Sequence, residues 1–235
     1  MLSTWTHTVT STSRRPRTTD RKHSDSLLAP IERRLATWML RWVPRWLHSH
    51  HLTLLTVVWS ALALAIASAA RLDHRWLWAL SLCILGQYAT DAVDGKVGQI
   101  QNAGLVRWGY YMDHFLDYCF LCAILLAYGA LLPSNQEYLM TIVLAVAGAF
   151  MVSAFLARAV TGVLTISFGG LGPVEMRLIF VAINTWLATV GRMTMLRAVP
   201  YAIGGSLLVL AALVFKTQRQ LWRLDARDRD ATATP

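Results

Sequence analysis

Residues 76–90 form an uncharged, largely apolar run, WLWALSLCILGQYAT, that leads directly into two acids, Asp91 and Asp94. After a short connection with several glycines, two more acids, Asp113 and Asp117, precede the next apolar run, 118–132. Uncharged runs of this kind are typical of buried or bilayer-crossing helices, and a short connection makes consecutive helices antiparallel neighbours. This stretch therefore predicts a helical hairpin that carries four acids at one end.

Further uncharged apolar runs lie on both sides of this hairpin. They cover residues 52–70, 138–157, 178–191 and 198–215. A transmembrane helix needs roughly 20 residues, and the shorter runs reach that length by including charged residues at one end. With 55% apolar residues, 15% charged residues and a mean hydropathy of +0.43, the 235-residue chain does not resemble an ordinary soluble domain. We predict an all-α, polytopic membrane bundle of six transmembrane helices.

The rest of the chain divides at its changes in composition. Residues 1–26 are rich in Ser, Thr and Arg and are predicted to form a disordered basic tail. In residues 27–49 the apolar side chains, three of them Trp, share one face of a helix and Arg residues share the other, which predicts an amphipathic helix at the membrane interface. The transmembrane domain then covers 50–217, and 218–235 form a cytoplasmic basic tail.

The positive charges predict the orientation in the membrane. If both termini face the cytoplasm, 18 of the 22 Lys and Arg residues lie on that side, as the positive-inside rule requires. The net charge of +9 then suits anionic lipid better than nucleic acid, and we expect no nucleic-acid partner. We expect an integral protein of a bacterial inner membrane, although the Ser- and Arg-rich start is also typical of an organelle transit peptide.

The four acids predict a metal site. Asp91 and Asp94 are three residues apart and Asp113 and Asp117 are four apart, so each pair shares one face of its helix. Four converging carboxylates repel unless a cation lies between them, and oxygen ligands without His or Cys favour Mg²⁺ or Mn²⁺. Mg²⁺ usually serves a phosphate-bearing substrate. Ion pairs with nearby Lys or Arg residues are the structural alternative.

The spacing of these residues resembles a known signature. The chain reads Asp91-x2-Asp94-Gly95-x2-Gly98-Gln99-x9-Gly109-x3-Asp113-x3-Asp117, and the CDP-alcohol phosphotransferase family carries D-x2-D-G-x2-A-R-x8-9-G-x3-D-x3-D. Six of the eight fixed positions agree, over a resemblance that extends from about residue 30 to 220. The predicted six helices and the place of the motif on the second and third of them are also similar to that family.

The resemblance implies a role for each acid. In that family the first three aspartates, here Asp91, Asp94 and Asp113, hold the divalent metal that bridges the donor pyrophosphate. The fourth, here Asp117, is the base that removes the proton of the acceptor hydroxyl, and it completes the predicted set of four metal-site acids. His114, next to Asp113, is similar to the Asp-His pair of the choline and ethanolamine phosphotransferase branch.

The resemblance also implies nucleotide contacts at the remaining motif positions. Gly95 and Gly98 leave room for a flat ring against the backbone, and Gly109, one turn before Asp113, leaves the metal site open. Gln99 stands where the family has Arg, so a fixed positive charge near the phosphates is missing. Lys96, Arg107 and Arg177 are the candidates to supply that charge.

These features together predict a membrane transferase of phospholipid biosynthesis. We expect it to move a phosphatidyl or phosphoalcohol group from a CDP-linked donor to a hydroxyl acceptor and to release CMP on the cytoplasmic side. The donor is CDP-diacylglycerol with a polar alcohol acceptor, or a CDP-amino alcohol with diacylglycerol. The alternatives are an intramembrane prenyltransferase, an ion or solute transporter that uses the intramembrane acids, and a non-catalytic relative, which Gln99 suggests.

The partners follow from the same argument. The bilayer, the donor and the acceptor are the expected ones. A homodimer is predicted from the family resemblance and from small residues that permit close helix packing, at Gly148, Gly204 and Gly205.

Overall fold

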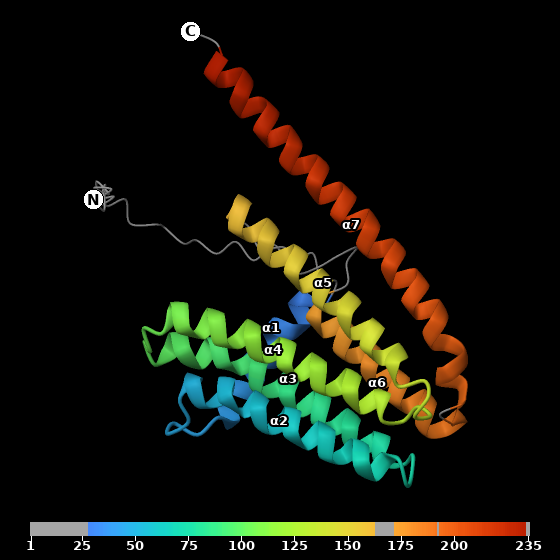
Figure 1. Ribbon diagram of the computed structural model, residues 1–235. Helices are drawn as coiled ribbons and strands as arrows, with labels where there is room; N and C mark the ends of the chain where they lie inside the picture. The colour runs from blue at the N-terminus through green and yellow to red at the C-terminus, as the bar shows by residue number, and fades with distance from the viewer. Residues whose placement is uncertain (1–27, 163–171, 192, 234–235) are drawn as a thin grey trace, which may run out of the picture.

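The structure is a computed structural model that describes residues 28–162, 172–191 and 193–233. Every regular element in these ranges is helical, which confirms the all-α prediction (Figure 1). The elements are α1 (Ala29–Met39), the 3₁₀ turn η1 (Leu40–Trp42), α2 (Ser49–Ala70), α3 (Trp76–Ile100), α4 (Val106–Gly129), α5 (Tyr138–Thr161), α6 (Pro173–Val190) and α7 (Met193–Ala233). The tail predicted to be disordered, 1–26, lies outside the described residues.

Five of these helices are long and apolar enough to cross a membrane: α2, α4, α5, α6 and α7. The sixth predicted span corresponds to α3, which has 25 residues but is not in that group. Its second half is polar because it carries Gln87, Asp91, Asp94 and Lys96. The protein is therefore a polytopic membrane bundle with five spans that meet the length and composition of a membrane crossing, and α3 lies among them as the most polar helix.

The centre of the bundle is formed by α2, α3 and α4, in which α2 packs against both of the others (Figure 1). α3 runs antiparallel to α2, and α4 runs parallel to it. Leu80, Ile84 and Ile124 are almost completely buried between them. α6 packs on α3, and α5 packs on α4 and on α7. The site described below lies where α3 ends, α4 begins and α6 begins.

The approach of α2 to α3 depends on Gly86. A Cβ atom at this position would lie 2.5 to 2.9 Å from ring atoms of Trp59 on α2. The Trp59 indole also donates a hydrogen bond of 3.2 Å to the hydroxyl of Thr90, the residue before Asp91. The glycine therefore lets the indole ring approach α3 closely, about one turn from Asp91.

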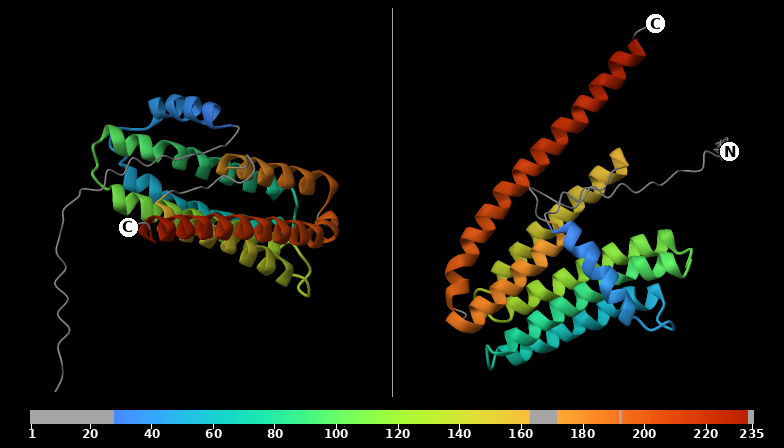
Figure 2. Two further views of the ribbon diagram at one scale, coloured as in Figure 1. Left: turned by 90° about the horizontal axis from the view of Figure 1, so that it is seen from above. Right: turned by 180° about the vertical axis from the view of Figure 1, so that it is seen from behind.

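α1 lies across the bundle rather than along it (Figure 2). Lys96 of α3 donates hydrogen bonds to the carbonyl oxygen of Arg33 at 2.8 Å and to the hydroxyl of Thr37 at 2.6 Å. The helical stretch ends at Trp42, two residues before Pro44, because a proline disfavours helical geometry in the residue before it. The range predicted as one interfacial helix, 27–49, is thus a shorter helix followed by a turn.

The outer face of this segment is rich in Trp and Arg. Trp38, Trp42 and Trp46 are 54%, 74% and 72% exposed, and the described side chains of Arg33, Arg34, Arg41 and Arg45 are exposed as well. Exposed Trp beside Arg is the composition of a helix at a lipid surface. The interfacial position of α1 stays a prediction that this surface supports.

α7 is much longer than the other helices and ends far from them. It has 41 residues and continues without interruption through the range predicted as a basic tail, 218–235, as far as Ala233. Its last part stands clear of the bundle in two views (Figures 1 and 2). That tail is therefore helical over most of its length.

Candidate active site

Three of the four predicted acids come together at one end of the bundle. Asp91 lies on α3, and Asp113 and Asp117 lie on α4. One carboxylate oxygen of each lies within 4.8 Å of the others, and all three side chains are partly buried. The helices bring them together because the connection from Gln101 to Leu105 is short. Two of its residues, Asn102 and Gly104, adopt left-handed backbone angles that reverse the chain.

Asp94 faces a different neighbour. It is 7% exposed and accepts hydrogen bonds from the hydroxyl groups of Ser49 and Thr53 on α2. It does not belong to the three-acid group just described. Its predicted role as a metal ligand stays a prediction, and in the structure Asp94 joins the metal-site end of α3 to α2.

Arg177 of α6 reaches into the group of acids. Its Nη2 atom lies 2.7 Å from Oδ2 of Asp91 and 3.4 Å from Oδ1 of Asp117. The Arg177 side chain is only 12% exposed, so these contacts are shielded from most of the solvent. The guanidinium therefore offsets part of the negative charge that the three carboxylates bring together.

Gln87 forms hydrogen bonds with both Asp117 and Arg177. It is fully buried, donates from Nε2 to Oδ1 of Asp117 at 3.1 Å and accepts at Oε1 a hydrogen bond of 3.1 Å from Nε of Arg177. Sequence reasoning did not single out this residue. The sequence does contain a feature that marks it. Gln87 is a polar residue inside an apolar run, and it lies four residues before Asp91 and therefore on the same helix face.

The three basic residues predicted to supply the charge of the missing motif Arg lie in different surroundings in the structure. Lys96 is bound to α1, as described above, and Arg107 is exposed at the start of α4. Only Arg177, of these three, contacts the acids. Gln99 itself is exposed on α3. A positive charge is thus present at the site, but it comes from α6 instead of the motif.

The motif glycines differ in their surroundings. A Cβ atom at Gly95 or at Gly109 would meet nothing within 4 Å among the residues that the structure describes. Within the described structure, the space expected beside these two positions is open. A Cβ atom at Gly98 would lie 3.1 Å from the Ser49 hydroxyl, so this glycine serves the close approach of α2.

His114 lies beside the acids in an aromatic setting. Its Nδ1 atom is 3.3 Å from Oδ2 of Asp113, although the geometry is not that of a hydrogen bond. The ring centroid lies 4.3 Å from that of Tyr110 and 5.7 Å from that of Phe155 on α5. Tyr110 also carries the guanidinium of Arg158 over its face at 4.0 Å. The space between α4 and α5 next to Asp113 is therefore lined by rings.

Glu175 stabilises the start of α6 and connects it to α1. It is 8% exposed and accepts hydrogen bonds from the backbone N–H groups of Gly172 at 2.8 Å and Leu28 at 3.1 Å. This is the capping arrangement that relieves unpaired N–H groups at a helix N-terminus. The remainder of the preceding loop, 163–171, lies outside the described residues.

The donor set fits a hard divalent cation. Three carboxylates offer oxygen atoms only, which suits Mg²⁺ or Mn²⁺ better than softer metals. A Mg²⁺ site normally leaves positions for water and substrate phosphates, and a set of three side-chain ligands leaves such positions. Asp91, Asp113 and Asp117 are the residues that would hold the ion.

Comparison with known proteins agrees with this arrangement. The family model described as CDP-alcohol phosphatidyltransferase matches residues 44–216, which include every residue of the acid group and Arg177. The chain therefore belongs to the CDP-alcohol phosphatidyltransferase family. A curated relative, human cholinephosphotransferase 1, is 32% identical over 111 residues, which are 45% of this chain and 27% of that protein. The matched part thus spans about a quarter of the relative. No solved structure matches the chain.

Proposed function

We propose that the protein transfers a phosphatidyl or phosphoalcohol group from a CDP-linked donor to a hydroxyl acceptor and releases CMP. The observation that carries the proposal is the group of three carboxylates with Arg177 at the end of α3 and α4. The family membership supports a transferase of phospholipid synthesis. Both termini and the site are proposed to face the cytoplasm of a bacterial cell, in line with the charge distribution.

The position of each side chain indicates its proposed role. Asp91, Asp113 and Asp117, with Asp94 as the further predicted ligand, would hold the divalent ion, Mg²⁺ or Mn²⁺. When bound, such an ion would offset the negative charge on the transferring phosphoryl group and on the departing CMP. Arg177 supplies a second positive charge for the donor phosphates, in the role that the motif Arg has elsewhere.

Asp117 is the proposed base. The acceptor oxygen attacks the β-phosphorus of the donor, the bond to the bridging oxygen of CMP breaks, and the acceptor proton passes to the Asp117 carboxylate. Gln87 and Arg177 both contact Oδ1 of Asp117. Oδ2 is therefore the oxygen that can take the proton, and the two contacts fix its direction.

The space beside Gly95 and Gly109 is proposed to admit the nucleotide and the reacting groups. Gly98 and Gln99 complete the predicted nucleotide contacts. Gln99 favours a second candidate, a non-catalytic relative. Arg177 argues against it because the charge absent at position 99 is present at the site from another helix.

The test is CMP release by the purified protein in lipid with Mg²⁺ or Mn²⁺. The panel offers CDP-diacylglycerol with polar alcohols, and CDP-amino alcohols with diacylglycerol, the pair that the likeness to a cholinephosphotransferase supports. We expect metal-dependent CMP formation that requires one acceptor and falls by about 10³-fold or more in Asp117→Asn, since the base is lost.

The matched control is Asp225→Asn, which removes an exposed acid on the far part of α7. It should keep full activity. CMP release that is equal in both variants would reject Asp117 as the base. A folded protein that is silent with the whole panel and gains activity in Gln99→Arg would support the non-catalytic relative instead.

A further inference from the structure

α7 extends well beyond what a bilayer requires. At 1.5 Å per residue its 41 residues measure about 60 Å, whereas the hydrocarbon core of a bilayer is about 30 Å thick. The apolar part of the helix ends near Phe215, and a charged part follows up to Ala233. The first turns of the charged part therefore lie at the level of the lipid headgroups.

Four basic residues of this extension share one side of the helix. Lys216, Arg219, Arg223 and Arg227 follow each other at intervals of three and four residues, which places them on one face. We call these four residues the α7 basic face, and all four side chains are exposed. By the same helical geometry Asp225 and Arg229 fall on the opposite side, and Asp230, in the last turns, falls on the basic side.

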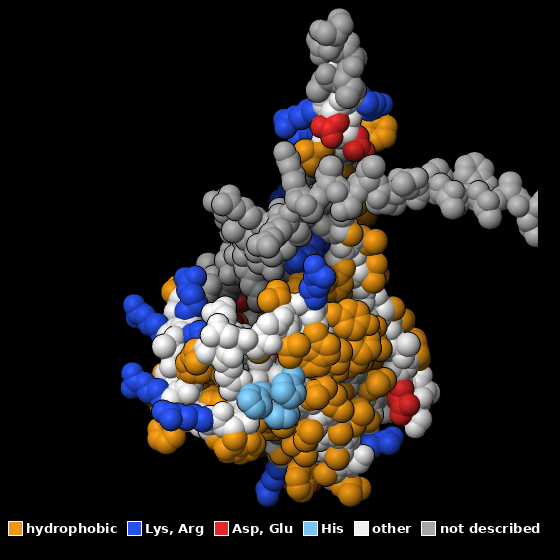
Figure 3. Space-filling model, turned by 90° about the vertical axis from the view of Figure 1, so that its left-hand side faces the viewer, with side chains coloured by type: hydrophobic (Ala, Val, Ile, Leu, Met, Phe, Trp, Pro, Cys, Tyr) orange, Lys and Arg blue, Asp and Glu red, His pale blue; other side chains and the backbone are white. Residues whose placement is uncertain are grey.

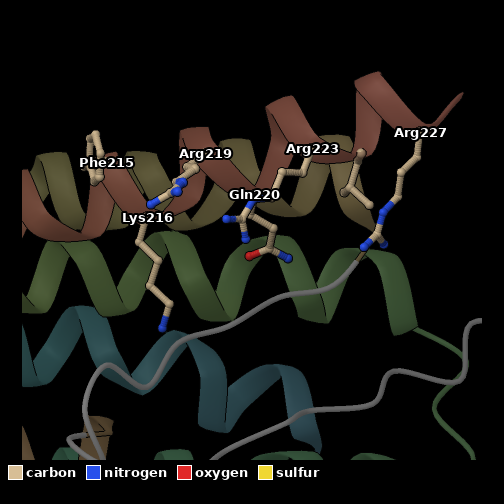
Figure 4. A pocket seen from close by; sticks show the side chains of 7 residues that line it. Phe215, Lys216, Arg219, Gln220, Arg223 and Arg227 are labelled. Carbon is tan, nitrogen blue, oxygen red and sulfur yellow. The ribbon is translucent and has the colours of Figure 1, made fainter. Parts of the chain in front are cut away.

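The α7 basic face carries Gln220 and Leu224 beside its charges. Lys216, Gln220 and Arg227 extend from the same side of the helix, while Phe215 points away (Figure 4). This surface thus combines cationic side chains with an amide and an apolar side chain close to the end of the apolar part of α7.

The side chains of the α7 basic face indicate the kind of ligand that it binds. Guanidinium groups bind phosphate oxygens in pairs, and Lys binds them as a point charge. Clusters of at least four Lys or Arg directly after a transmembrane helix attract anionic phospholipids. Leu224 offers apolar surface to the glycerol and the upper acyl chains. A soluble anion would use only the charges and would need no such position next to the bilayer.

We propose that the α7 basic face is a binding site for the headgroups of anionic phospholipids in the leaflet at which the three acids open. The four basic residues cover about 16 Å along the helix, so more than one headgroup phosphate can be contacted at once. The site does not depend on the reaction proposed above. It ties the last part of α7 to the membrane surface.

The experiment measures lipid retention by the full chain. The purified protein in detergent is titrated with phosphatidylglycerol or with phosphatidylcholine of the same acyl chains, and bound lipid is counted by native mass spectrometry. The test variant is Arg219→Gln/Arg223→Gln/Arg227→Gln. The matched control, Arg71→Gln/Arg75→Gln/Arg197→Gln, removes three exposed charges at the other end of the bundle.

We expect the wild-type protein and the control to prefer phosphatidylglycerol, and the test variant to bind it at least roughly tenfold more weakly, since each charge near the surface contributes about a factor of five. Arg219→Lys/Arg223→Lys/Arg227→Lys should keep most of the preference because the charges remain. This charge-retaining variant also separates lost binding from lost folding.

Three results would overturn the proposal. Equal affinity for the two lipids would remove the preference for anionic headgroups. Equal loss in the test variant and the control would mean that net charge, and not this face, attracts the lipid. Full competition by soluble glycerophosphoglycerol at matched concentration would assign the face to free phosphate compounds.

Discussion

Arg177 on α6 contacts acids on α3 and α4, which lie far from it in the sequence. With 2.7 Å to Asp91 and 3.4 Å to Asp117, the guanidinium occupies the same carboxylates that a divalent ion would use. An ion that binds there must share or displace these contacts. The side chain thus both offsets the acids in the metal-free protein and opposes the entry of a metal.

Replacing Arg177 by Gln tests this double role. In the presence of EDTA, the variant should lose up to about 3 kcal/mol of stability because three carboxylates lose their cation. Added Mn²⁺ should restore more stability to the variant than to the wild-type protein, as mass action requires of tighter binding. The measurement is thermal unfolding in micelles with EDTA and across a Mn²⁺ titration.

Arg107→Gln is the control, since Arg107 is exposed and is not in contact with the acids. It should respond to Mn²⁺ like the wild-type protein. If Arg177→Gln gained no more stability from Mn²⁺ than the control does, competition between the guanidinium and the metal would be rejected.

At the scale of single residues, the sequence predicted the acids but not the side chains that hold them. The spacing of the acids within each helix follows from helical geometry, so their common end was predictable. The separation of Asp94 from the other three was not, because it depends on Ser49 and Thr53 reaching across from α2. Gln87 could have been found as a polar residue in an apolar run.

The helices themselves depend on a few close contacts. The α2–α3 pair is the clearest example, because the Trp59 ring fills the place of a side chain at Gly86. The same ring holds Thr90 by a hydrogen bond. Packing between these two helices is therefore coupled to the position of Asp91, the next residue.

Gly86→Ala should loosen this contact. The added methyl group would lie 2.5 Å from the nearest ring atom, and overpacking of this kind costs about 1–3 kcal/mol. We expect a lower melting temperature and a reduced rate of CMP release, because Thr90 and Asp91 move with the ring. Circular dichroism on heating and the CMP assay measure the two effects.

Gly129→Ala is the matched control. A Cβ atom there would meet Met140 at 3.4 Å, an ordinary contact, and Gly129 is far from the acids in the same bundle. An unchanged melting temperature in Gly86→Ala would show that the indole ring moves aside at no cost.

The length of the elements was less predictable than their existence. All six apolar runs are parts of helices, but α3, α4 and α7 extend well past them into polar sequence. Apolar composition reports only the lipid-facing and buried parts of a helix, and a helix does not have to end where its apolar face does. The acids of the site lie in two of these polar extensions, the second part of α3 and the first half of α4.

The molecule as a whole presents its basic side chains at the end that carries the acids. Figure 3 views the molecule from this side, with Lys and Arg side chains around the edge and histidines grouped next to a hydrophobic flank. The apolar flank suits lipid and the basic edge suits anionic headgroups. This distribution supports the predicted orientation, with this end in the cytoplasm.

A homodimer is the predicted assembly. Gly204 and Gly205 of α7 border open space, since a Cβ atom at either would meet nothing within 4 Å in the described structure. Small residues on an exposed transmembrane face allow a second helix to approach closely. Mass photometry in nanodiscs should give twice the chain mass of 26.2 kDa, after subtraction of the disc.

Gly204→Leu should shift that distribution toward the monomer because the larger side chain holds the second helix away. Asn184→Ala is no suitable control, since Asn184 bonds to Tyr128 inside the protomer. Leu208→Ala, on an exposed position one turn further, changes size without filling the gap and should leave the dimer intact. A monomer in the wild-type protein would contradict the prediction.

The pairing of Asp91 with Arg177 also has a consequence for how the chain is made. The two residues are 86 positions apart, and α6 is synthesised after α3, α4 and α5. At about 5–20 residues per second, the acids emerge from the ribosome several seconds before their counter-charge. During that interval the hairpin of α3 and α4 carries three carboxylates without Arg177. Asp91 lies nine residues before the end of α3 and Asp117 at the middle of α4, so the acids are set back from the connecting turn. Gln87, which is made before both, is the partner within the hairpin that can bond Asp117 until α6 arrives.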